Sequence, residues 1–327
     1  MIYDESMKPN SRGFTGRISF AVFSVLSFVL LSLSFIETLR LHPFLSAFKG
    51  LIILGLVYGL YEEWRRASSI PPEARTWDRS DLYNFLAVFG GAVVTFFINV
   101  ELGHGPVAAS GIVGILGAAA LKKYAVPIFC GSFVGMASPA VFLSYYCILT
   151  AGAVAAAVYI LSKEVFNGFG GKLGTIAFTG CLSASLITGS PLLRLPAPGW
   201  DIGWMIVLYS IAGAAVTYTL SIRLENGPVM SSAIVGLMAG LFLPIIHGPY
   251  PGDTLAVMVF CASFAGMSSP VRFRNELPVA LSGIFCGLIF IYSTPYLGGA
   301  GGKLGTIAFS SVVAMRGLMD ALSGLKR

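Results

Sequence analysis

Apolar runs, each close to the length of a membrane crossing, dominate the chain and leave few folds open to it. Two N-terminal runs occupy 18–36 and 45–60, and ten more follow at 83–100, 106–121, 124–138, 140–162, 173–190, 203–222, 228–245, 254–270, 277–293 and 304–320. In lipid, a helix satisfies all of its backbone groups within one segment, so each run predicts a helix. Charged residues make up 11% of the chain, against about 25% in soluble domains. The sequence predicts an all-α polytopic membrane protein.

An exact repeat shows how the later runs are organised. Gly170–Phe178 reads GGKLGTIAF, and the same nine residues recur at Gly301–Phe309. Two further blocks match in the same order: Gly105-Pro106 with Gly227-Pro228, and CGSFVGMASP at 130–139 with CASFAGMSSP at 261–270. Three ordered matches indicate an internal duplication.

Charge and segment number predict how the duplicated parts sit in the membrane. The expected order is a tail (1–17), a transmembrane hairpin (18–61), a cytoplasmic linker (62–82), repeat 1 (83–190), a loop (191–202), repeat 2 (203–321) and a tail (322–327). Lysine and arginine collect on one side if both termini are cytoplasmic, as in a bacterial inner membrane. Five segments per repeat, an odd number, would place repeat 2 upside down, as in many secondary transporters. If the 124–138 run only dips into the membrane while 140–162 crosses it, the count becomes even and the inversion fails.

The two Ser-Pro blocks supply the first candidate site residues. Serine, glycine and proline inside an apolar run are typical of broken or re-entrant helices, whose freed backbone groups must face protein or water. The candidate solute contacts are Ser132, Phe133 and Ser138, with their counterparts Ser263, Phe264 and Ser269. Close helix packing through small residues is the alternative interpretation.

The repeated nonapeptide supplies the second set, Lys172 and Thr175 with their counterparts Lys303 and Thr306. Paired glycines permit unusual backbone angles, and the free N–H groups at a helix start attract anions. Lysine snorkelling at a helix end is the simpler alternative. Because both copies keep the flanking glycines, we favour a functional role.

These features favour a transporter or permease that moves a small polar, anionic solute along a path between two inverted repeats. None of the fifteen carboxylates lies mid-span, which argues against a carboxylate-centred cation antiporter. The alternatives are a facilitative channel for a small neutral solute and a non-transporting sensor or assembly subunit, which a solidly packed repeat interface would favour. An enzyme is not expected, because the matching polar residues are split between two faces.

No cofactor or metal is expected either. The five cysteines lie in apolar runs and the three histidines lack metal-ligand spacing. The formal charge of +6 is explained by membrane topology rather than by nucleic acid. The expected partners are a small-molecule solute and the lipid bilayer, with a homo-oligomer as an open option.

Overall fold

The computed structural model describes residues 11–68 and 78–324, and within them the chain is helical and has no strand. The predicted tails and linker lie partly outside these residues. The twelve α-helices of the described part are α1 Ser11–Leu41, α2 Ser46–Ser68, α3 Arg79–Phe96, α4 Pro106–Ala120, α5 Ala125–Gly135, α6 Tyr145–Leu161, α7 Lys172–Thr188, α8 Trp200–Tyr218, α9 Pro228–His247, α10 Pro249–Gly266, α11 Glu276–Ser293 and α12 Lys303–Gly324.

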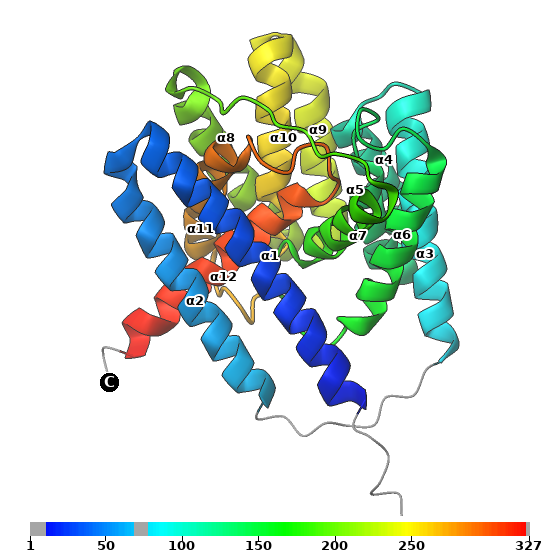
Figure 1. Cartoon of the computed structure of the whole chain (residues 1–327), viewed down its shortest axis with the longest axis horizontal. Coiled ribbons are helices and arrows are strands. Elements are labelled where there is room, and N and C mark those ends of the chain that lie inside the picture. The colour runs from blue at the N-terminus through cyan, green and yellow to red at the C-terminus, as the bar shows by residue number, and fades with distance from the viewer. Residues whose placement is uncertain (1–10, 69–77, 325–327) are drawn as a thin grey trace, which may run out of the picture.

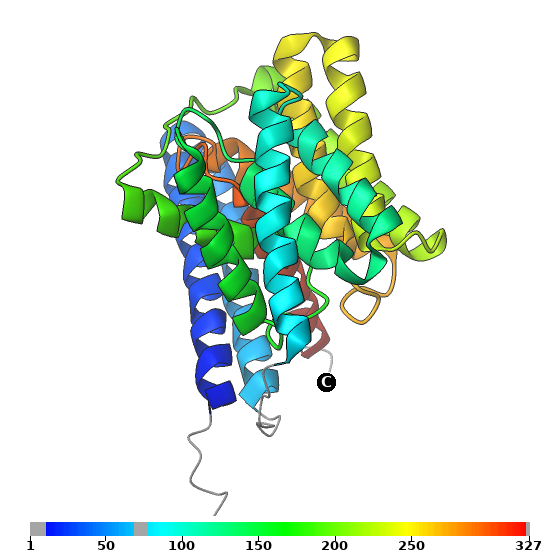
Figure 2. The same cartoon turned by 90° about the vertical axis from the view of Figure 1, so that its right-hand side faces the viewer.

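Six described helical segments are long and apolar enough to cross a membrane, which indicates a membrane-embedded protein. They coincide largely with α1, α2, α3, α8, α9 and α11. Figure 2 shows α1, α2 and α3 extending over most of the height of the molecule. Three shorter apolar helices, α4, α6 and α7, have 15 to 17 residues. The prediction of an all-α membrane fold is confirmed at this level.

Matching helix boundaries occur in the two copies. Pro106 and Pro228 occupy the first turns of α4 and α9, where the missing N–H of proline has no intrahelical partner to lose. Each follows a glycine whose φ is 76°. A π-helical turn precedes each loop, at Phe97–Glu101 and Thr219–Arg223. The duplicated sequence therefore repeats its local backbone geometry as well.

Both Ser-Pro blocks interrupt the helices. The first interruption separates the end of α5 at Gly135 from the start of α6 at Tyr145, and the second separates α10 from α11. Within the predicted 124–138 run, only 11 residues form α5. At 1.5 Å per residue such a helix is far shorter than a bilayer core.

The N-terminal hairpin covers one side of the second copy. Figure 1 shows α1 and α2 crossing over α12, and α1 also packs on α11. A Cβ on Gly317 of α12 would overlap the backbone of Gly55 and Gly59 in α2, so these two helices touch through their backbones. Buried Lys49 of α2 donates to the Leu288 carbonyl of α11 at 3.0 Å.

Helix contacts are reciprocal between the copies. In the first copy α3 packs against α5 and α6, and in the second α8 packs against α10 and α11 in the same way. The copies join through α4 against α9 and through α7 against α12. Equivalent helices therefore face each other across the centre of the molecule.

Candidate functional site

The two nonapeptides meet at a close crossing of α7 and α12. Gly171 and Gly302, which precede these helices, both have a φ of 83°, a conformation that glycine adopts without strain. A Cβ on Gly171 would overlap the backbone of Gly305, and a Cβ on Gly302 would overlap that of Gly174. The glycine spacing shared by the two blocks thus lets the helix starts touch inside the molecule.

Aromatic rings fill the space beside this crossing. Phe133 of α5 and Phe264 of α10 lie with ring centroids 4.5 Å apart, and each is 1% exposed. Phe129 packs on Phe133 at 4.5 Å and Phe260 packs on Phe264 at 4.6 Å. This cluster, here called the four-phenylalanine cluster, closes the centre of the interface between the copies.

The two lysines of the nonapeptides have different surroundings. Lys303 is buried, and its Nζ donates to the carbonyls of Ser293 at 2.7 Å and Tyr296 at 2.5 Å. A cation here complements the carbonyl end of α11. Lys172 is partly exposed, and its Nζ donates to Oδ1 of Asn167 at 2.9 Å. Equivalent residues are therefore bound differently on the two sides of the molecule.

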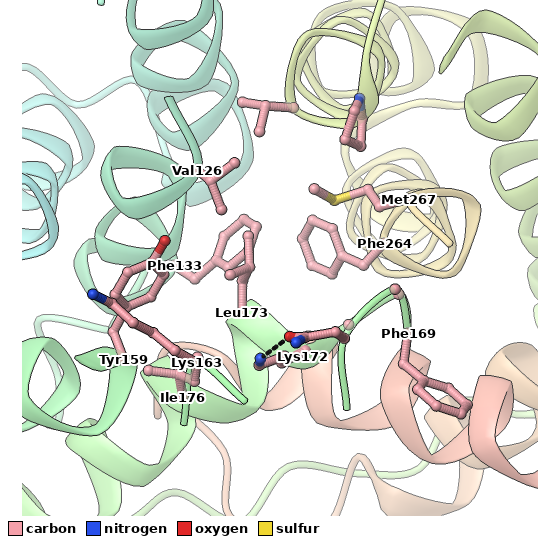
Figure 3. A pocket seen from close by; sticks show the side chains of 16 residues that line it. Val126, Phe133, Tyr159, Lys163, Phe169, Lys172, Leu173, Ile176, Phe264 and Met267 are labelled. Carbon is pink, nitrogen blue, oxygen red and sulfur yellow. Dashed lines mark hydrogen bonds between the residues drawn. The ribbon is translucent and has the colours of Figure 1, made fainter. Parts of the chain in front are cut away.

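A cavity of about 270 Å³ lies on the Lys172 side of the four-phenylalanine cluster. Its walls come from both copies, with Val126 on α5, Ile176 on α7 and Val229 on α9. Figure 3 shows Phe133 and Phe264 side by side, with Lys172 at one end of the cavity. Because Val126, Asn167 and Pro228 are exposed, the cavity reaches the surface of the protein.

A second lysine in the cavity wall is paired. Lys163 forms an ion pair with the carboxylate of Asp81 at the start of α3. Asp78 caps α3 by accepting a hydrogen bond from the Asp81 backbone N–H at 3.1 Å. Hydrogen bonds from the Ser80 hydroxyl and this N–H lower the pKa of the Asp78 carboxyl. The α3 start therefore holds Asp81 in place against Lys163.

The loop between α6 and α7 forms the cavity rim and is held from outside. Arg272 Nε donates to the Asn167 carbonyl at 2.9 Å, and its guanidinium lies 4.0 Å from the Phe169 ring centroid. Arg272 also pairs with Glu63 of α2 at 2.6 Å. Through these contacts the N-terminal hairpin supports the rim.

The opposite side is covered by a different loop. Leu193, between α7 and α8, exchanges two backbone hydrogen bonds of 2.9 Å with Gly298, just before the second nonapeptide. The Tyr296 hydroxyl donates to Glu37 of α1 at 2.7 Å, and this bond raises the pKa of Tyr296. The Lys303 side is thus closed by a loop and by the hairpin.

The predicted serines and threonines lie apart from the cavity. Ser132 is hydrogen-bonded to Ser110 at 2.8 Å, and Ser263 to Ser232 at the same distance, all four being fully buried. The other polar candidates lie in connecting loops or at helix starts, and their backbone N–H groups donate to glycine carbonyls: Ser138 to Gly299, Ser269 to Gly168, Thr175 to Gly171 and Thr306 to Gly302. These contacts fasten the fold around the site.

The structure brings Lys172, Phe133 and Phe264 together at the cavity, and it adds residues that sequence reasoning missed. Tyr159 and Lys163 stand at the end of an apolar run, and Asn167 and Phe169 stand in a loop. The one sequence feature that could have identified these four residues is their closeness to the first nonapeptide. Met267, from the other copy, has no such feature. In residues 11–68 and 78–324, no three His, Cys, Asp or Glu side chains gather in a way that could hold a metal.

Comparison of the chain with protein-family models, curated proteins and solved structures gave no match.

Proposed function

We propose that the protein is an integral membrane transporter that moves a small polar, anionic solute between the two duplicated parts. The observation that supports this most is the cavity at their interface, which reaches the surface on one side and ends at Lys172 and the four-phenylalanine cluster. Ligand sites in transporters of this architecture lie at the interface between repeats. Lys172 supplies the charge that favours an anion.

The repeats in this proposal are inverted. Reciprocal contacts support the assignment. Gly171 of the first nonapeptide packs on the second nonapeptide, and Gly302 of the second packs on the first. Likewise, Gly170 lies against the Phe264 carbonyl and Gly301 against the Phe133 carbonyl. Such exchange is expected of two similar units related by a two-fold rotation. The short, interrupted α5 belongs to the broken helices that these architectures use near their sites.

We assign the Lys172 side to the cytoplasm of a bacterial inner membrane, with both termini on that side. Lys122 and Lys123 precede α5, and Arg223 precedes α9, close in sequence to the cavity rim. Excess lysine and arginine on one side favours this orientation. The cavity would then face inward.

The two lysines suggest how access alternates. At the positions that match Ser293 and Tyr296, the first copy has Ser162 and Val165 at the end of α6. In the opposite state, Lys172 would bind these two carbonyls and Lys303 would be released, closing one side and opening the other. Exchange between two discrete arrangements of equivalent parts is the general scheme of alternating access.

Flux into proteoliposomes that contain the purified chain tests the proposal. A panel of labelled small anions should include one whose uptake depends on the protein, and Lys172→Ala and Lys303→Ala should both reduce it. Exposed Lys122→Ala serves as the matched control and should leave uptake unchanged. Wild-type uptake by both nonapeptide variants would refute an anion path through these lysines.

A counterflow experiment distinguishes a carrier from a channel. A carrier accelerates uptake when unlabelled solute fills the vesicle, whereas a channel does not. Protein-dependent flux of neutral solutes alone, without acceleration, would favour the channel. No flux of any solute by correctly folded protein would favour a non-transporting subunit.

A further inference from the structure

Among the described residues that line the cavity, Lys172 is a cation that donates to no carboxylate. Lys163 is neutralised by Asp81, whereas Lys172 donates to a neutral amide. Glu164 acts on Lys172 only through longer-range electrostatics, because it is exposed and does not line the cavity. The charge balance of the cavity wall is therefore +1, and burying a second uncompensated negative charge there would be costly.

Polar groups gather at one end of the cavity. The Oδ1 atom of Asn167 accepts a hydrogen bond from Lys172, and this contact fixes the orientation of the side-chain amide. The amide nitrogen of Asn167 is then free to donate to a solute. An ammonium and an amide N–H can together satisfy the two oxygens of one carboxylate.

Apart from Lys163, which is paired with Asp81, most of the remaining wall is apolar. Val126, Phe133, Ile176, Val229, Phe264 and Met267 line it. A fully hydrated, multiply charged ion such as sulfate would lose its water against these side chains without gaining partners. At about 270 Å³ the cavity falls just below the range of about 300–1,000 Å³ for drug-sized ligands. Both observations favour a small molecule with an apolar body.

Building on the proposed function, we propose that the solute is a small monoanion with a short apolar body, of the chemical class of the aliphatic monocarboxylates. Its carboxylate binds Lys172 and Asn167, and its carbon chain lies toward Phe133 and Phe264. Inorganic polyanions are excluded by the single charge, and neutral solutes of the same shape bind more weakly because they lose the ionic contact.

Binding to the purified full chain in detergent provides the first test, by calorimetry with butyrate, its neutral isostere butyramide, and sulfate. We expect butyrate to bind most tightly. Lys172→Gln should weaken butyrate binding at least about tenfold, because a charge-assisted hydrogen bond is lost, and should leave butyramide binding unchanged. Lys172→Arg should retain most of the affinity, and exposed Lys122→Gln should retain all of it. Size-exclusion profiles confirm that each variant is folded.

Uptake into proteoliposomes separates this inference from the proposed function. Methanesulfonate is the probe, because it is a monoanion with an apolar end and stays ionised, so it does not cross lipid as a neutral acid. Butyrate binding together with methanesulfonate uptake supports both claims. Uptake of sulfate or butyramide in preference to monoanions overturns the inference and leaves transport standing. Butyrate binding without uptake of any probe overturns transport alone, and neither binding nor uptake overturns both.

Discussion

Replacing Gly171 by alanine tests the close backbone contact at the crossing of α7 and α12. The substitution has two costs. A φ of 83° places alanine in the left-handed region, at roughly 1–2 kcal/mol. The new Cβ also overlaps the backbone of Gly305 and Phe309, which cannot rotate away, so overpacking adds about 1–3 kcal/mol. We expect a total loss of about 2–5 kcal/mol in the free energy of unfolding.

Gly189, at the other end of α7, supplies the matched control. Its φ is 68°, yet a Cβ there meets no atom within 4 Å. Gly189→Ala should therefore show the backbone strain alone. Reversible unfolding in mixed detergent micelles measures both variants, and the difference between them isolates the crossing. Equal losses for Gly171→Ala and Gly189→Ala would refute the close approach of the two helices.

Three further predictions concern the cavity and its surroundings. Asp81→Asn should free the charge of Lys163, so sulfate should bind the cavity more tightly than in wild type, measured by calorimetry. Phe133→Ala should open the four-phenylalanine cluster and increase the passive leak of small solutes from vesicles. Tyr296→Phe should cost about 1–3 kcal/mol of stability by leaving buried Glu37 without this donor. Because the folded-state pKa of Tyr296 is raised, its contribution is present below about pH 10 and is lost as pH rises further. Unfolding free energies of wild type and Tyr296→Phe should therefore converge at high pH.

Hydropathy was enough to predict the helical membrane fold, because a bilayer demands continuous helices whatever the tertiary contacts. The predicted helix starts were accurate where a glycine-proline pair marks the boundary, as at Pro106 and Pro228. Hydropathy placed ends less well, since α1 runs from Ser11 to Leu41 rather than over 18–36. Polar residues at a helix end continue the hydrogen-bonded ladder without changing the apolar signal.

The duplication pointed to Lys172, Phe133 and Phe264, because a repeated residue is visible within one sequence. Their role in solute contact is still a prediction. The sequence does not single out Asn167, Arg272 or the loop at Leu193, because they do not belong to the repeated blocks. Their positions depend on tertiary contacts between segments far apart in the chain, such as Arg272 with Asn167, and periodicity contains no information on these contacts.

The difference between Lys172 and Lys303 was also invisible, since the two blocks are identical in sequence. It arises from what surrounds them. The hairpin and the Leu193 loop cover the Lys303 side, and the first copy has no equivalent of the Tyr296–Glu37 bond, because Val165 stands where Tyr296 does. Two identical nonapeptides must have different surroundings if the molecule is open on one side and closed on the other.

If solute passes through the cavity between the two copies, a bulky group attached to Val126→Cys should block its passage. Val126 lines the cavity and is 40% exposed, while the five native cysteines are buried. The measurement is methanesulfonate uptake into proteoliposomes before and after complete reaction with a bulky, charged thiol reagent. Uptake should fall to the level of protein-free vesicles. Unchanged uptake by fully modified protein would contradict passage through the cavity.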